Sequence, residues 1–209
     1  MILKSDRIAE LLEEGQDPET EDPLVIRPSP DLKDLRESGA ASVDLRLGTW
    51  FMTLREARLP YLDVQQGAGK ASQLTKTHYV PFGDRFYLHP RAFVLSATLE
   101  WICLPKGKAA YVIGKSSWGR RGLIIATATG VHPGFKGCLT LELTNVGEIP
   151  IVIMPGMPIC QLFIHYVKEG QFKEVDRSAF VGNRKPTLGS VTLDDVARKL
   201  ADAPDLDQS

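Results

Sequence analysis

The fold class is decided by the stretch Gly137-Cys138-Leu139-Thr140-Leu141-Glu142-Leu143-Thr144-Asn145. Leucines alternate here with threonines and a glutamate, and side chains of a β-strand point to opposite faces with a period of two. One face of the predicted strand is therefore wholly leucine and faces a core. The other face carries the Glu142 carboxylate between two hydroxyl groups, and the residues alone leave open whether it is a solvated surface group or a functional one.

Short apolar runs recur about every ten positions on both sides of this strand and are separated by turn residues. This spacing favours a β-sandwich or β-barrel over a doubly wound fold. The further predicted strands are 92–101, 109–113, 123–128, 149–154 and 159–167.

The two ends of the chain predict short helices. Ser5–Glu14 has apolar residues at helical spacing, with Ser5 as the predicted cap and Gly15 as the stop. Near the other end, Thr192 and Asp195 form a capping-box-like start, and Pro204 ends that helix.

The remaining segments are predicted to be loops within one domain. Residues 16–40 are rich in proline and read as an irregular connection with one brief strand at 24–27, and 64–76 reads as a second loop. We expect a single domain over 1–209. It comprises an N-terminal helix and loop (1–40), a β core (41–168), and a tail over the active site with a C-terminal helix (169–209).

Composition restricts the class of protein. The chain has 209 residues, 25 basic and 26 acidic, with a formal net charge of -1. A general nucleic-acid or membrane-surface binder would carry a basic excess, so we expect neither partner, whereas a small anionic ligand needs only local basic residues.

The three cysteines have no CxxC spacing, which favours reduced thiols. Without a secretory apolar region or the ~20 apolar residues of a membrane span, we expect a cytoplasmic protein.

A polar segment at 114–122 follows a predicted strand and suits an anion. If 117–121 forms a helical turn, Ser116 and Arg120 lie four positions apart on one face. Free N–H groups at the start of the turn, together with Lys115, would suit a phosphate. The alternative is that Arg120 and Arg121 are ordinary surface charges.

The sequence lacks the motifs of several other nucleotide-binding and hydrolytic enzymes. None of the four histidines has a glutamate two positions later and no CxxC pair is present, which excludes the zinc site of the zinc-dependent deaminases. No Walker A loop, GxGxxG turn or GxSxG elbow appears.

Five linked motifs follow one another along the chain: Ser42-Val43-Asp44-Leu45-Arg46-Leu47-Gly48, the 115–122 segment, His132-Pro133-Gly134-Phe135-Lys136-Gly137, Leu141-Glu142-Leu143-Thr144-Asn145 and Pro155-Gly156-Met157-Pro158-Ile159-Cys160-Gln161-Leu162. In this order they resemble the dCTP deaminase family, which belongs with the trimeric dUTPases. The similarity covers the chain from its first helix to about residue 167. It implies a distorted antiparallel β-barrel of the jelly-roll type. It also implies a homotrimer with active sites at subunit interfaces.

The resemblance implies hydrolytic deamination of dCTP to dUTP and ammonia without a catalytic metal. Glu142 would be the general base toward water attacking C4 of cytosine. Ser116 and Arg120 would hold the water and stabilise the tetrahedral intermediate. Mg²⁺ would accompany the triphosphate, and dTTP is expected as an inhibitor.

The resemblance also assigns residues to the substrate. Lys115, which replaces the family's usual arginine, would contact the phosphates together with Ser117 and Gln161. The backbone of Thr127, Ala128 and Thr129 would face the edge of the base. Phe135 would pack against the deoxyribose, unless it is a plain core aromatic, and His132 would replace the usual aspartate at the 3′-hydroxyl. Arg184 and Lys185 match approximately the tail that covers the phosphates.

Two alternatives remain open. A dUTP diphosphatase, or a bifunctional deaminase–diphosphatase, would need a carboxylate in the hairpin Gly130-Val131-His132, where histidine stands instead. The same scaffold without turnover would be a nucleotide-binding or regulatory protein, although binding alone does not require a general base.

Overall fold

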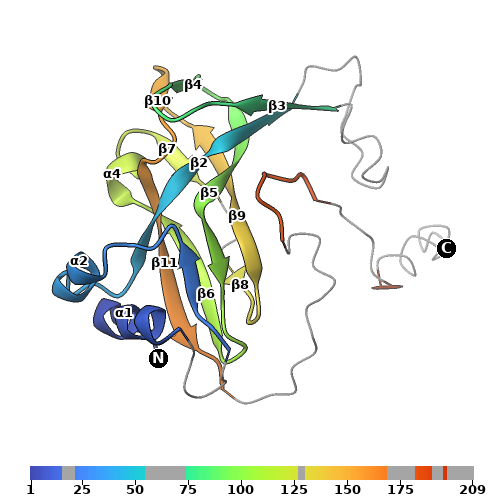
Figure 1. Ribbon diagram of the computed structural model, residues 1–209. Helices are drawn as coiled ribbons and strands as arrows, with labels where there is room; N and C mark the ends of the chain where they lie inside the picture. Colours follow the sequence, from blue (N-terminus) through green and yellow to red (C-terminus); the bar gives the residue numbers. More distant parts are fainter. Residues whose placement is uncertain (16–21, 55–73, 127–129, 169–181, 190–194, 197–209) are drawn as a thin grey trace, which may run out of the picture.

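The protein is a curled antiparallel sheet with helices at one end, as the mainly β prediction expected (Figure 1). The computed structural model describes residues 1–15, 22–54, 74–126, 130–168, 182–189 and 195–196. Nine strands form one sheet in the order β7-β9-β5-β2-β11-β6-β8, with β1 on β5 and β3 on β2, and β4 pairs separately with β10. The strands are β1 Val25–Arg27, β2 Val43–Leu54, β3 Thr75–Tyr79, β4 Phe86–Leu88, β5 Phe93–Cys103, β6 Lys108–Gly114, β7 Leu123–Ile125, β8 Gly130–Val131, β9 Lys136–Asn145, β10 Ile151–Ile153 and β11 Pro158–Tyr166.

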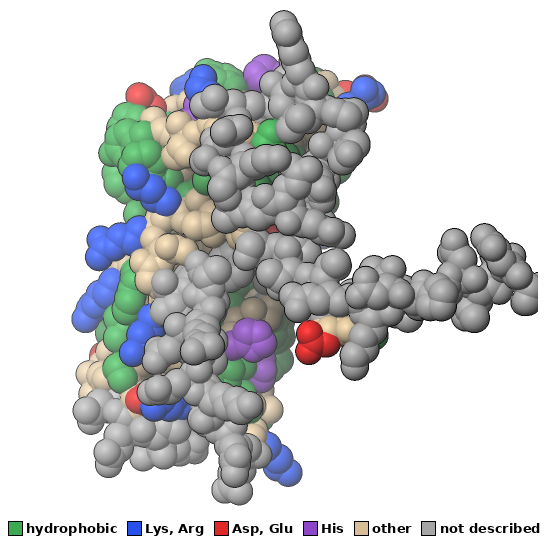
Figure 2. All heavy atoms as spheres, turned by 90° about the vertical axis from the view of Figure 1, so that its right-hand side faces the viewer, with side chains coloured by type: hydrophobic (Ala, Val, Ile, Leu, Met, Phe, Trp, Pro, Cys, Tyr) green, Lys and Arg blue, Asp and Glu red, His purple; other side chains and the backbone are tan. Residues whose placement is uncertain are grey.

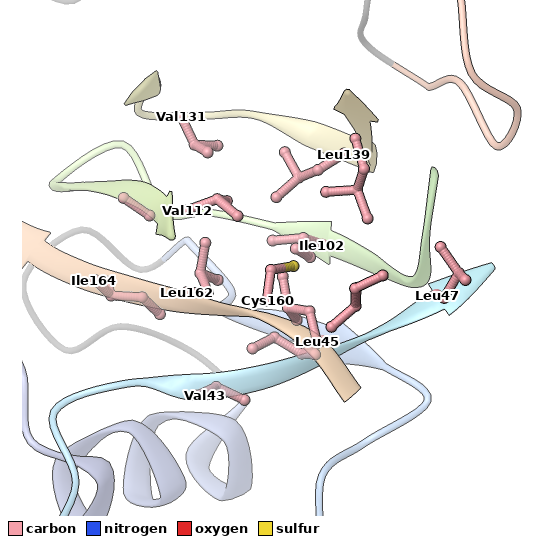
Figure 3. Packing of buried hydrophobic residues seen from close by; sticks show 14 of the residues in the cluster. Val43, Leu45, Leu47, Ile102, Val112, Val131, Leu139, Cys160, Leu162 and Ile164 are labelled. Atoms are coloured by element: carbon pink, nitrogen blue, oxygen red, sulfur yellow. The ribbon is translucent and has the colours of Figure 1, made fainter. Parts of the chain in front are cut away.

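The leucine face of β9 lies in the core, as its alternation predicted. Leu139, Leu141 and Leu143 are buried, whereas the intervening side chains are half-buried on the other face. Figure 3 shows apolar side chains of β2 and β11 pointing toward those of β6, β8 and β9 across the curled sheet. Burial of this kind supplies the main favourable free energy of folding, at roughly 25 cal/mol per Å² of apolar surface.

The first helix is confirmed, and a second one was missed. α1 spans Ser5–Glu14 and ends at Gly15, whose φ of 71° favours glycine. The predicted cap is wrong, because Lys4 occupies the cap position while buried Ser5 accepts a hydrogen bond from the Ser38 hydroxyl (3.1 Å). α2, Leu32–Glu37, lies in the predicted loop and is too short to show a period.

The strand predictions hold in position but not always in length. The predicted 123–128 strand ends at Ile125 in β7, and the predicted 149–154 strand is the shorter β10. Strands β2, β3, β4 and β8 were not among the predicted runs, and residues 75 and 76 of the predicted loop belong to β3. The rest of that loop mostly lies outside the described residues.

The C-terminal helix lies largely outside the described residues, which include only Asp195 and Val196 of its predicted span, both helical. Within the part of the chain that the structure describes, no helix has the length and apolar character to cross a membrane.

Candidate active site

Strand β9 presents Glu142 on the face of the sheet opposite the leucines. Glu142 pairs with Leu95 of β5, and its carbonyl accepts a hydrogen bond from the N–H of Ala126 (2.9 Å). The Glu142 side chain is half-buried. The three residues predicted to face the base, Thr127, Ala128 and Thr129, follow Ala126 directly and lie outside the described residues.

The polar segment after β6 forms a helical turn, α4, Ser116–Gly119. The predicted turn is confirmed, although it begins one residue earlier, with Lys115 as its cap residue. The N–H of Arg120 donates to the carbonyl of Ser116 (3.0 Å), so these two residues lie one turn apart. Ser116, Ser117 and Arg120 are all exposed, as binding to a ligand or a partner requires.

Lys115 and Gln161 meet at one carboxylate. The Lys115 ammonium forms an ion pair with Asp44, and Gln161 Nε2 donates to Asp44 Oδ1 (3.2 Å) and to the Ser42 hydroxyl (3.3 Å). Gln161 can reach Asp44 because the two residues are register partners in the neighbouring strands β11 and β2. The sequence prediction assigned no role to Ser42 or Asp44. Both residues stand in the 42–48 motif, but no pattern in the sequence indicated that they would contact Gln161 and Lys115.

The hairpin between β8 and β9 carries His132 and Phe135. His132 is exposed, and its carbonyl accepts a hydrogen bond from the N–H of Phe135 (3.2 Å). Phe135 is half-buried and packs against the hydrophobic core, while its carbonyl accepts from the N–H of Leu104 (2.9 Å). Phe135 therefore contributes to the packing of the core.

The two predicted tail cations lie elsewhere. The segment 182–189 docks on β9, where the N–H of Gly182 donates to Lys136 (2.6 Å) and the N–H of Cys138 donates to Asn183 (2.9 Å). The Lys185 ammonium then lies over the Trp50 ring, 3.8 Å from its centroid. Arg184 and Lys185 of one chain therefore lie apart from Lys115, Ser117 and Gln161 of the same chain. The residues predicted to bind the phosphates thus fall into two separate groups.

The ladder of β7 and β9 also separates Glu142 from α4. Ile125 pairs with Leu143, so both side chains lie on the core side, opposite Glu142. A Cβ added to Gly114, just before α4, would lie 3.4 Å from the Ile125 side chain. The turn α4 therefore begins on the core side of the ladder. Figure 1 shows α4 on the left of the sheet and the 182–189 segment on the right, beyond β9.

Charge alone does not mark the site. Figure 2 shows the face on the right of Figure 1, where the described Lys and Arg side chains lie scattered, most of them toward the left edge and others at the top and the lower right. Glu100 is a carboxylate that is only 2% exposed, and it accepts a hydrogen bond from the N–H of Arg46 (2.8 Å). Burial raises the pKa of Glu100, and the hydrogen bond opposes that effect. Burial also raises the pKa of the Cys160 thiol to about 12, so this cysteine is no nucleophile.

Comparison with known proteins places these motifs in one family. A family model described as dCTP deaminase-like matches residues 2–167. The chain is 38% identical over 162 residues to a "dCTP deaminase, dUMP-forming" of Methanobrevibacter smithii, covering 77% of this chain and 78% of that protein. It is 35% identical over 198 residues to a protein of the same name from Dictyoglomus thermophilum (93% and 96% covered), and 38% identical over 169 residues to a "dCTP deaminase" of Halorubrum lacusprofundi (80% and 78% covered).

A solved structure supports the fold independently. The 2′-deoxycytidine 5′-triphosphate deaminase of Agrobacterium tumefaciens superimposes with a TM-score of 0.58 at 23% identity. The match covers 79% of this chain and 48% of that one, so this chain spans about half the length of that structure. The matched motifs, the family model and the shared fold agree: this chain belongs to the dCTP deaminase-like family.

Proposed function

We propose that this protein is an enzyme that hydrolyses dCTP to a deoxyuridine nucleotide and ammonia, with Glu142 as the general base. The observation that carries this proposal is the position of Glu142. Its half-buried carboxylate lies on the polar face of β9, beside the segment that would contact the base, while its neighbours in sequence form the core. A carboxylate that only solvates the surface would not need to be half-buried next to the segment that contacts the base.

The reaction needs one base that also delivers protons. The Glu142 carboxylate removes a proton from water as the water oxygen bonds to C4 of cytosine. The C4–N3 double bond opens, and N3 takes up that proton. Glu142 then carries the hydroxyl proton to the amino group, the C4–N4 bond breaks, ammonia leaves and a carbonyl forms at C4. Ser116 and Arg120 would hold the water and the developing charge, for which fixed donors supply about 3–4 kcal/mol each.

We propose that these groups come from two subunits of a homotrimer. The turn with Ser116 and Arg120 follows Gly114, which lies against Ile125 on the core side of the β7–β9 ladder, whereas Glu142 lies on the other side. This placement supports a site that a partner subunit completes. The face that carries Glu142 also exposes large apolar side chains, with Phe93 42% and Ile124 40% exposed. Apolar surface rimmed by polar groups is typical of subunit contacts. A partner subunit's α4 would meet Glu142 across this face.

The triphosphate would bind where Lys115, Ser117 and Gln161 gather. Lys115 now pairs with Asp44, and phosphate oxygens would compete for its ammonium. We propose that Mg²⁺ accompanies the triphosphate, because this ion prefers phosphate oxygens and keeps several waters. We expect the reaction in the cytoplasm, where the three buried free thiols would stay reduced.

We propose dUTP as the product, because exposed His132 stands where a diphosphatase would need a carboxylate. The names of the Methanobrevibacter and Dictyoglomus relatives favour a second candidate, a reaction that continues to dUMP. In that case a carboxylate outside the hairpin would activate the second water. Inhibition by dTTP stays a prediction from the family.

The test is a product assay with purified protein, Mg²⁺ and separate dCTP, CTP, dCMP and dUTP, with and without dTTP. Ammonia and dUTP from dCTP would support the proposal. Pyrophosphate and dUMP from dCTP would establish the second candidate. Binding of dCTP without release of ammonia would contradict both and leave a nucleotide-binding protein.

A further inference from the structure

A pocket of about 440 Å³ lies on the Glu142 side of the sheet but apart from Glu142. Its walls come from β1, β2, β5, β9 and the 182–189 segment. Cys138, which lines it, lies four residues before Glu142 on the same face of β9, roughly 13 Å along the strand. Neither Glu142 nor the Lys115 cluster lines this pocket, so the proposed reaction leaves it without a role.

One row of the sheet sets the floor of the pocket. Arg27 of β1 pairs with Trp101 of β5, and Trp101 pairs in turn with Cys138 of β9. Register partners share a face, so a guanidinium, an indole and a thiol lie side by side there. Trp50 of β2 and Arg184 of the tail segment complete the wall across from this row.

Two cations, Arg27 and Arg184, line the pocket, and a third, Lys185, lies over the ring of its lining residue Trp50. Arg27, Arg184 and Lys185 are exposed, and none of them forms an ion pair with another residue that the structure describes. Burial raises the pKa of the Cys138 thiol, and the charge of Arg184 opposes this rise, which places the guanidinium near the thiol. The buried carboxylate of Glu100 also acts on this thiol, and it raises the pKa of Cys138. The tail cations, which do not reach the Lys115 cluster, are therefore gathered here without an ion-pair partner among the described residues.

We propose that this pocket binds a nucleoside phosphate, with Arg27 and Arg184 on the phosphate and Trp101 against the base. A guanidinium matches a phosphate with two parallel hydrogen bonds. An indole face stacks on any nucleobase. The volume lies within the ordinary range of small-ligand pockets, roughly 300–1,000 Å³. The indoles favour a nucleotide over free phosphate, and Trp50 already holds Lys185 on one face, which leaves Trp101 for the base.

The test measures binding of dUMP, which has neither an amino group nor a diphosphate to lose, by equilibrium dialysis of the full-length protein. The variants are Arg27→Ala with Arg184→Ala, Lys115→Ala in the proposed substrate site, and the matched control Arg85→Ala, an exposed arginine. Inorganic pyrophosphate is the second probe, and it distinguishes a nucleotide site from a simple anion site.

We expect the Arg27/Arg184 double variant to lose one class of dUMP site, with affinity reduced tenfold or more, as loss of even one strong charged contact would do. Lys115→Ala and Arg85→Ala should keep that class. If the proposed substrate site does not bind dUMP, binding at the pocket should still be seen, and the double variant should still remove it. Failure of the proposed function can therefore be told apart from failure of the pocket proposal. Retention of every dUMP site in the double variant, or equal binding of pyrophosphate, would overturn the proposal.

A second measurement, limited proteolysis, reports whether a ligand protects the 182–189 segment. The bond after Arg184 is a trypsin site, and Arg184 would hold the ligand. We expect dUMP to slow cleavage at this bond in the Lys115→Ala protein, in which the proposed phosphate contact of the substrate site is lost. Cleavage at the same rate with and without dUMP would contradict a ligand between Arg184 and the sheet.

Discussion

Arg120 shows how one exposed side chain can matter more for turnover than for folding. It follows α4, is exposed, and donates only its backbone N–H to the turn among the contacts described for it. We therefore expect Arg120→Ala to lower the rate of dCTP deamination roughly 10²–10³-fold, as removal of one donor from a developing charge does elsewhere. The melting temperature should stay unchanged. A normal rate with a lowered melting temperature, from one calorimetric and one kinetic measurement, would assign Arg120 a structural role.

Glu100 is the residue whose titration should be visible in stability. Burial raises its pKa in the folded state above the ordinary 4.5, so the native protein holds this proton more tightly than the unfolded chain. The contribution of Glu100 to the free energy of unfolding is therefore complete below pH 4.5 and is lost as the pH rises through the folded-state pKa.

Glu100→Gln should remove that dependence. The amide oxygen can still accept from the N–H of Arg46, so the fold should persist. Urea unfolding of both proteins at several pH values from 4 to 8 checks this, and the wild type should lose stability relative to the variant as the pH rises. A constant difference across this range would show that Glu100 keeps its ordinary pKa.

At the scale of elements, β9 joins the core to the site. Leu141 is fully buried, whereas Thr140 beside it is half-buried on the opposite face. We expect Leu141→Ala to lower the free energy of unfolding by about 2–5 kcal/mol through lost burial and a cavity. The matched Thr140→Ala should cost much less, about 1 kcal/mol at most. Equal losses in urea unfolding would contradict the assignment of the two faces.

The elements also show what could be predicted from sequence. The alternation in β9 predicted both its core face and the position of Glu142, because period two is a local property. The short helix α2 was missed, since six residues show no period. Strand β2 was missed because its alternation is interrupted near Gly48, at a register shift opposite β5.

Parts of the site depend on contacts that no local pattern encodes. The ion pair of Lys115 with Asp44 follows from the pairing of β11 with β2, residues far apart in the chain. The placement of Arg184 and Lys185 follows from docking of the tail on Trp50 and β9, which a motif match could not locate.

At the scale of the whole molecule, the account predicts complementation between inactive chains. If Glu142 and Arg120 of each site come from different subunits of a trimer, Glu142→Gln and Arg120→Ala chains can restore each other. Mixed after unfolding and refolded together in equal amounts, they should regain about a quarter of the wild-type activity, since each site draws two residues independently. Sedimentation should show a trimer throughout. A mixture as inactive as either variant would place both residues in one chain.

The most direct test of the central claim is release of ammonia from dCTP by the wild type and by Glu142→Gln. We predict that the wild type forms dUTP and ammonia. Glu142→Gln should bind dCTP with similar affinity but turn it over roughly 10²–10⁴-fold more slowly, the range that a positioned base supplies. Undiminished ammonia release by Glu142→Gln would contradict the proposed mechanism.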